Sequence, residues 1–211
     1  MKKPLFETLL VGMLLVLAVA AQAAEIAGTV KVVGRKGEVP TYVYAEPLEG
    51  GAAAKPGRFT MKQLNKQITP HVLVIPVGST VDFDNQDPIL HNIFTKQKPG
   101  EFDLGLYKTS KPVVFKTANT YRVFCNIHPE MTAVIHVVPT SYIAEVGGDG
   151  RYKLEVPAGK YRVTAWSERA APAVAEAAAG GAGPALTLDE SKYVELPHKN
   201  KFGKDYEYKA R

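Results

Sequence analysis

The chain has 211 residues and a formal net charge of +5, and 45% of its residues are hydrophobic. This composition is typical of a globular protein with enough apolar side chains for a core, and it excludes a fibrous or disordered chain. The sequence has no phosphate-binding loop, no solenoid repeat and no aromatic-interleaved basic repeat. Nucleic acid is therefore not an expected partner.

The first residues have the features of a secretory signal peptide. The basic "MKK" precedes the apolar "LLVGMLLVLAVA", and "AQA" at Ala21 to Ala23 supplies the small residues of a cleavage site. We expect residues 1–23 to be removed by cleavage near Ala23 or Ala24. The alternative is an uncleaved membrane anchor, for which the apolar run is short. Export predicts a bacterial periplasmic protein with no stable membrane insertion after cleavage.

Most segments that follow predict β-strands. "IAGTVKVV" and "TYVYAE" are rich in β-branched and aromatic residues, and "HVLVIPVGSTVDFDN" has an apolar run, a turn and then period-two alternation. "PVVFKT", "YRVFC" and "TAVIHVV" repeat the pattern. Short strands between Gly and Pro turns predict a sandwich or a barrel. "FTMKQLNKQ", residues 59–67, is the only plausible helical turn before residue 139.

A second unit follows "VVPTSYIAE". "GGDGRYKLEVPAGKYRVTAWSE" predicts a strand, a Pro-Ala-Gly turn and another strand, because its apolar and polar residues alternate on both sides of the turn. The Ala- and Gly-rich segment at residues 170–185 has the composition of a flexible loop or linker. "LTLDESKYVELP" offers one more strand to close a small sheet.

The C-terminal segment "KYVELPHKNKFGKDYEYKAR" carries six basic and three acidic residues, a net charge of +3. The simpler interpretation is a solvated, partly mobile tail. The functional alternative is electrostatic attraction to an acidic partner or to a membrane surface.

The only cysteine lies in "VFCNIHPEM", residues 123–131. An unpaired thiol in an exported protein needs a role, which can be burial, an intermolecular bond or metal ligation. Cys125, His128 and Met131 bring a thiolate, an imidazole and a thioether within seven residues. That set suits a soft metal ion such as copper. The alternatives are a buried apolar cysteine, a turn histidine and a methionine that fills the core.

A trigonal His₂Cys site with a weak axial Met needs a second histidine. The remaining candidates are His71, His91, His136 and His198. His91 is the best placed, at the mouth of a predicted strand 34 residues before Cys125, although it could be an ordinary hydrogen-bonded loop residue. His71 precedes an apolar strand, and strand alternation places His136 on the face opposite Met131. Neither is expected to share the site.

The segments "YRVFCNIHPEM" and "DNQDPILHNIF" resemble the cupredoxins, the small blue copper proteins. The Cys-x2-His-x2-Met spacing is most similar to that of amicyanin. Residues 60–139 as a whole resemble bacterial periplasmic plastocyanin-like proteins often labelled methylamine-utilisation proteins, and residues 140–168 resemble a carboxypeptidase-regulatory-like domain. The resemblance implies an all-β protein with a Greek-key cupredoxin sandwich at residues 24–139, followed by a small β-sandwich at 140–211.

The cupredoxin resemblance also implies the roles of individual residues. His91 and His128 would be the imidazole ligands of one copper ion per chain, Cys125 the thiolate ligand and Met131 the long axial ligand. Asn92 would pin the two ligand loops together by hydrogen bonds, as a residue in the second shell of the metal. In that family the edge of the second imidazole faces solvent and passes the electrons. Cupredoxins surround this edge with apolar residues, whereas this loop carries Asn126 and Glu130.

Three functions fit these features. The first is an electron carrier, not an enzyme, that shuttles between an acceptor and a periplasmic dehydrogenase or a c-type cytochrome. The second is a copper store, chaperone or sensor that the second domain tethers to a partner. The third is a copper enzyme similar to nitrite reductase or to the red copper proteins, which would need a second metal or a histidine shared between subunits.

Overall fold

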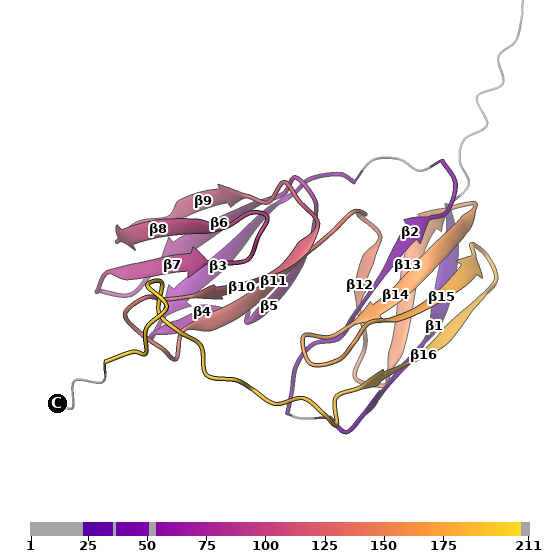
Figure 1. The fold of residues 1–211 in the computed structure, drawn as a ribbon. Coiled ribbons are helices and arrows are strands. Elements are labelled where there is room, and N and C mark those ends of the chain that lie inside the picture. Colours follow the sequence, from indigo (N-terminus) through magenta and orange to yellow (C-terminus); the bar gives the residue numbers. More distant parts are fainter. Residues whose placement is uncertain (1–22, 36, 51–53, 208–211) are drawn as a thin grey trace, which may run out of the picture.

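The computed structural model of the protein describes residues 23–35, 37–50 and 54–207. All regular secondary structure in these residues is β-strand, which confirms the predicted all-β class. Figure 1 shows two sandwiches side by side. The predicted signal peptide, apart from Ala23, lies outside the described residues. No helix in the described part of the chain is long and apolar enough to cross a membrane.

The first sandwich is built from consecutive strands in the middle of the chain. Its five-stranded sheet has the order β5-β11-β10-β7-β8, and its four-stranded sheet has the order β4-β3-β6-β9. The strands are β3 (Arg58–Leu64), β4 (Gln67–Thr69), β5 (Val72–Pro76), β6 (Thr80–Asn85), β7 (His91–Thr95), β8 (Phe102–Tyr107), β9 (Lys111–Val114), β10 (Asn119–Phe124) and β11 (Thr132–Val138).

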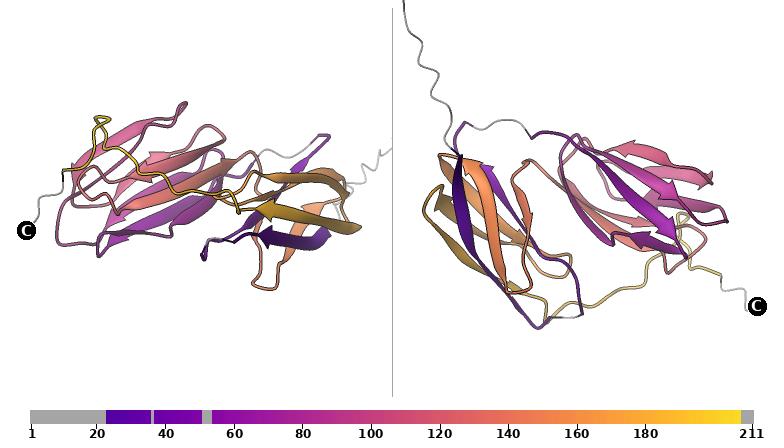
Figure 2. Two further views of the ribbon diagram at one scale, coloured as in Figure 1. Left: turned by 60° about the horizontal axis from the view of Figure 1, so that its bottom comes forward. Right: turned by 180° about the vertical axis from the view of Figure 1, so that it is seen from behind.

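The second sandwich takes its strands from both ends of the chain. Its sheets have the orders β13-β1-β16 and β12-β2-β14-β15. The strands are β1 (Ala23–Val33), β2 (Tyr42–Pro47), β12 (Ile143–Glu145), β13 (Arg151–Pro157), β14 (Lys160–Trp166), β15 (Ala173–Ala178) and β16 (Ala182–Asp189). Figure 2 shows both sandwiches from two further sides.

The position of β1 and β2 corrects the predicted domain boundaries. We expected both strands in the copper domain at 24–139, but β1 pairs with β13 and β16, and β2 pairs with β12 and β14. The physical reason is the buried face of each strand. Ile26 and Val43 are fully buried in the same core as Leu154 and Leu188. Only this long-range pairing shows that β1 and β2 belong to the second sandwich.

Two local predictions are also wrong. The helical turn expected at residues 59–67 is the hairpin of β3 and β4, in which Asn65 and Lys66 adopt positive φ values of 55° and 58°. An Asn at such a position is typical of a tight hairpin turn. The segment at 170–185, expected to be a flexible linker, contains β15 and the start of β16. Alanine is less common in strands than β-branched residues are, so the composition did not predict a strand here. The pairing of β15 with β14 overcomes this low propensity.

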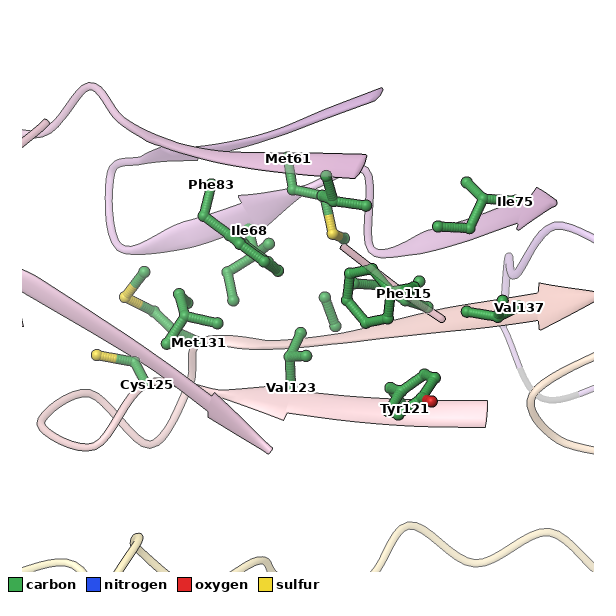
Figure 3. Packing of buried hydrophobic residues seen from close by; sticks show 14 of the residues in the cluster. Met61, Ile68, Ile75, Phe83, Phe115, Tyr121, Val123, Cys125, Met131 and Val137 are labelled. Carbon is green, nitrogen blue, oxygen red and sulfur yellow. The ribbon is translucent and has the colours of Figure 1, made fainter. Parts of the chain in front are cut away.

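Each sandwich has its own core. The first contains Phe83, Phe115 and Tyr121 together with two residues of the predicted site, Cys125 and Met131 (Figure 3). Burial alternates along β6 and β13, as the sequence predicts for strands with one face on a core. Two of the predicted copper ligands, Cys125 and Met131, therefore belong to the end of a packed core.

A third apolar cluster joins the two sandwiches. Val134 and Val138 of β11 pack with Val39 and Trp166, and Trp166 stacks on His136 with ring centroids 4.2 Å apart. Beside this cluster, the buried carboxylate of Glu168 accepts a 2.9 Å hydrogen bond from His71 and lies 3.8 Å from Arg122. The residues of β11 thus pack into the first core on one face of the strand and into the contact between the sandwiches on the other face.

Candidate metal centre

The first half of the site is the segment between β6 and β7. Asn85, the last residue of β6, organises this segment with its side-chain amide. Its Nδ2 donates to the carbonyl oxygens of Ile89 at 2.9 Å and Tyr107 at 3.1 Å, and its Oδ1 accepts from the backbone N–H of Asp87 at 3.0 Å. These bonds shape the turn that presents His91 at the start of β7, where we predicted it.

The second half is the loop between β10 and β11, which pair antiparallel. The loop is closed by two backbone hydrogen bonds: Cys125 N–H donates to Met131 O at 3.0 Å, and Met131 N–H donates to His128 O at 3.1 Å. Cys125 and Met131 are both fully buried, and His128 is partly exposed. The short loop therefore fixes one buried sulfur at each of its ends and one histidine at the surface.

The structure brings the side chains of His91, Cys125 and His128 together. The Nδ1 atoms of the two histidines are 3.1 Å apart, and Cys125 Sγ is 3.7 Å from His128 Nδ1. One donor atom from each of the three residues lies within 4.8 Å of the others. Residues that are 34 positions apart in the sequence thus converge at one end of the first sandwich.

Asp87 determines which nitrogen of His91 faces this cluster. Its carboxylate lies 2.7 Å from His91 Nε2, and because a carboxylate can only accept, Nε2 carries the proton. The lone pair of Nδ1 then points toward His128 and Cys125. Burial opposes ionisation of Asp87, but hydrogen bonds from the backbone of Lys66, from His91 and from the backbone of Asn65 outweigh it and hold the pKa of this carboxyl below its ordinary value.

The environment of His128 also favours its neutral imidazole form. Burial lowers its pKa, and the neighbouring His91 lowers it further. Neutral imidazole is the form that binds metal ions.

Two of the three donor separations suit a shared metal ion, and all three are no longer than 4.8 Å. Typical bond lengths of about 2.0 Å to imidazole nitrogen and about 2.3 Å to thiolate sulfur leave donors roughly 3–4 Å apart around a shared ion. The observed 3.1 Å and 3.7 Å lie in that range. The mixture of two imidazoles and one thiolate suits copper or zinc.

Met131 lies in the same part of the core. Figure 3 shows the sulfur atoms of Cys125 and Met131 pointing toward the same end of the sandwich, away from Phe115 and Tyr121. A thioether so placed would add a weak, soft ligand and would favour copper over zinc.

Asn92 makes different bonds from those that the resemblance implies. Its Nδ2 donates to Asp103 Oδ1 at 2.6 Å and to the carbonyl of Gly105 at 3.0 Å. Both acceptors lie on β8, so Asn92 ties β7 to β8. The described hydrogen bonds of its side chain do not join it to the loop of Cys125.

The other histidines lie away from the donor cluster, as predicted for two of them. His71 contacts Glu168, and His136 contacts Thr120 Oγ1 at 2.8 Å, both near the junction of the sandwiches. His198, also among the candidate ligands, is not one of the three clustered donors but lies beside the ligand loop. Its Nε2 lies 2.8 Å from the carbonyl oxygen of Pro129 in the ligand loop.

The C-terminal segment agrees with part of its prediction. Its described residues are mostly exposed, as expected for a solvated tail at 192–211, but the segment is bound to the ligand loop. Lys201 N–H donates to Asn126 Oδ1 at 3.0 Å, and Tyr206 Oη donates to Cys125 O at 2.8 Å. Asp87 was missed as well, although its position four residues before His91 was visible in the sequence. No sequence pattern marked the contact of the C-terminal segment, because its residues lie some 75 to 81 positions from their partners.

Solved structures of several copper proteins are similar to part of this chain. The chain is 29% identical to a Cu-containing nitrite reductase from Thermus scotoductus SA-01, with a TM-score of 0.37, over 44% of this chain and 25% of that one. It is 20% identical to a Sinorhizobium pseudoazurin, with a TM-score of 0.36, over 40% of this chain and 76% of that one. For a purple cupredoxin from Nitrosopumilus maritimus, the identity is 24% and the TM-score 0.33, over 37% and 98% of the two chains.

The chain thus spans a quarter of the length of the nitrite reductase. No protein-family model matches the sequence, and no curated protein matches it. The functional proposal therefore rests on the geometry of the site itself.

Proposed function

We propose that this protein is a periplasmic type 1 copper protein that transfers single electrons between redox partners. The observation that carries the proposal is the convergence of His91 Nδ1, His128 Nδ1 and Cys125 Sγ within 4.8 Å. Met131 is proposed as the long axial ligand. Within the residues that the structure describes, this is the one group of three or more potential metal ligands of its kind, which supports one copper ion per chain.

When bound, copper supplies one-electron redox chemistry between Cu(II) and Cu(I). The contribution of the protein is to hold the donor atoms in one arrangement. Asn85 and Asp87 fix the segment that carries His91, and the two backbone bonds of Met131, one with Cys125 and one with His128, fix the other loop. Donors that are held by the fold need little movement when the charge of the ion changes, which favours fast electron transfer.

His128 is the ligand nearest to solvent and is the proposed point of electron exit. It is partly exposed, between Ile127, which is 46% exposed, and the exposed Glu130. His91 and Cys125 are fully buried, so neither can meet a partner directly. The partner would be a periplasmic dehydrogenase or a c-type cytochrome, and the periplasmic location rests on the signal-peptide features of residues 1–23.

A visible spectrum of the full chain, purified after periplasmic expression and loaded with Cu(II), tests the proposal. We expect intense absorption from thiolate-to-copper charge transfer, one copper per chain, and loss of the colour in Cys125→Ser and His91→Gln. His71→Gln is the matched control, because His71 lies outside the donor cluster, and it should keep the colour. A colourless wild-type protein, or colour that survives Cys125→Ser, would contradict the proposal.

Electron exchange separates a carrier from a copper store. The Cu(II) and Cu(I) forms of a carrier should exchange electrons quickly with each other and with a c-type cytochrome. Tight Cu(I) binding without such cycling would favour the store, chaperone or sensor.

A further inference from the structure

The chain after β16 returns to the first sandwich. Figures 1 and 2 show this segment running from the second sandwich to the end of the first sandwich that carries the loop between β10 and β11. We call residues 198–206 the clasp. Its side of the contact comes from three residues in particular, His198, Lys201 and Tyr206.

His198 covers the flank of the ligand loop. Its ring stacks on Phe124, with centroids 4.2 Å apart and planes inclined by 24°, and its Nε2 lies 2.8 Å from Pro129 O. Because a carbonyl can only accept, Nε2 is the donor in this bond. Phe124 precedes one predicted ligand, Cys125, and Pro129 follows another, His128. His198 therefore packs against residues adjacent to two proposed ligands.

Tyr206 reaches a ligand residue itself. Its hydroxyl donates to the carbonyl oxygen of Cys125 at 2.8 Å and lies 3.3 Å from Nδ1 of His198. The rings of the two residues also meet edge to face, with centroids 5.2 Å apart, while each residue binds a different carbonyl of the loop.

Lys201 connects the clasp to both ligand segments. Its backbone N–H donates to Asn126 Oδ1 at 3.0 Å, and its Nζ donates to Asp103 Oδ2 at 2.8 Å. Asp103 in turn accepts from Asn92, the residue after His91. Asn126 is the polar residue that the sequence analysis noted at the electron-exit edge. Its side-chain oxygen is therefore hydrogen-bonded to the clasp.

The clasp has a defined shape of its own. Asn200 Oδ1 accepts from the backbone N–H groups of Phe202 and Lys204, and Lys199 pairs with Asp205 across the turn. The acceptors that the clasp uses, Cys125 O, Pro129 O and Asn126 Oδ1, are different from the atoms that form the two internal backbone bonds of the loop. The internal bonds and the clasp thus hold complementary sets of atoms.

We propose that residues 198–206 act as a positioning element of the metal centre, which holds the loop of Cys125 and His128 in its ligand geometry. The inference deepens the proposed function, because it assigns the ligand loop an external support delivered by the second sandwich. Without the clasp, the loop keeps its two internal hydrogen bonds but loses the supports at Cys125 O, Asn126 and Pro129. The position of the proposed electron-exit histidine relative to Cys125 then becomes variable.

The variant Tyr206→Phe tests this proposal in the full chain, because it removes one hydroxyl and keeps the ring. Tyr193→Phe is the matched control, since it makes the same chemical change on the same segment, where the ring packs over Arg169. Amide hydrogen exchange at Cys125 and Met131, whose N–H groups donate the two internal bonds of the loop, should rise by about fivefold in Tyr206→Phe when measured without copper, the effect of losing one neutral hydrogen bond. It should not change in Tyr193→Phe. Unchanged exchange in Tyr206→Phe would overturn the proposal.

A second readout uses the copper-loaded protein. Tyr206→Phe and His198→Ala should shift the visible charge-transfer bands and the reduction potential, while Leu196→Ala, at a side chain that is 77% exposed, should leave both unchanged. Faster exchange with an unaltered spectrum and potential would overturn the positioning role. If the wild-type chain does not develop the copper spectrum, the proposed function fails, but the exchange measurement still decides whether the clasp holds the loop. Denaturation followed by Trp166 fluorescence checks that each variant is folded.

Discussion

The two sandwiches have the same general architecture and were assembled from the chain in different ways. The first is continuous from β3 to β11, and its core ends in the sulfur and imidazole groups of the candidate metal centre. The second combines β1 and β2 with strands that follow residue 142, and its core consists of aliphatic and tyrosine side chains. The difference teaches that the candidate metal ligands come from one unit, while the other pairs strands from before β3 with strands after β11 and is followed by the clasp.

The largest expected effects are those that test whether the two cores are independent. Phe83→Ala in the first core and Leu154→Ala in the second remove side chains that are 0% and 2% exposed. We expect losses of about 3–5 and about 2–5 kcal/mol in the free energy of unfolding. Because Trp166 packs with valines of β11, both variants should move the denaturation transition seen by its fluorescence as well as that seen by circular dichroism.

Val174→Ala, at a side chain that is 55% exposed, is the control and should have little effect. A fluorescence transition that stays in place in Phe83→Ala, while the first sandwich is destabilised, would show that the sandwiches unfold separately.

The junction between the sandwiches should be sensitive to acid. Burial lowers the pKa of His136 to about 4 from 6.5. Between these pH values the unfolded chain binds more protons at this residue than the folded chain, so stability is lost as the pH falls through this window, by at most about 3 kcal/mol. His136→Phe keeps a ring against Trp166, and its unfolding free energy should fall less over the same window in parallel denaturation curves. An identical pH slope in both proteins would contradict this prediction.

Within the first sandwich, a substitution of Asp87 tests whether its carboxylate supports metal binding specifically. Asp87→Asn removes the charge that polarises His91, and the expected cost is about tenfold to 100-fold in copper affinity, measured by competition with a chelator. Asp82→Asn is the control, since Asp82 pairs with Arg58 on another part of the same sandwich. Equal affinities in the two variants would show that the Asp87 carboxylate has no special role.

The smallest effect is expected at the ion pairs between the sandwiches. The hydrogen bond that His71 donates to the Glu168 carboxylate raises the pKa of His71. In Glu168→Gln this pKa should fall toward its ordinary value, which an NMR titration of the His71 ring would detect. We expect a stability loss of about 1 kcal/mol below the pKa of His71, where the ring is protonated, because two partners of Glu168, His71 and Arg122, are about half exposed.

Glu155→Gln on β13 is the control for that variant, and it should leave His71 unchanged. If the pKa of His71 is the same with and without the Glu168 carboxylate, the bond between the two residues does not operate in solution.

Much of the site was readable from residue types and spacing. Cys125, His128 and Met131 lie in one short loop, and strand alternation correctly separated His136 from them. His91 could be chosen among the histidines because it begins a strand. Its partner Asp87 was not recognised, because a carboxylate four residues from a histidine is common on any loop and only the folded turn shows that the two meet at 2.7 Å.

The sequence by itself determined the all-β class, the alternation of buried and exposed residues along the strands and the set of donors available for a soft metal ion. These properties are local, since each depends on residue type and on spacing over a few positions. The tertiary structure alone decided that β1 and β2 belong to the second sandwich, that the alanine-rich segment forms strands and that the basic C-terminal segment lies on the ligand loop. All three depend on pairing between residues far apart in the chain, which is selected by complementary buried faces and hydrogen-bonding groups, and no local pattern encodes that choice.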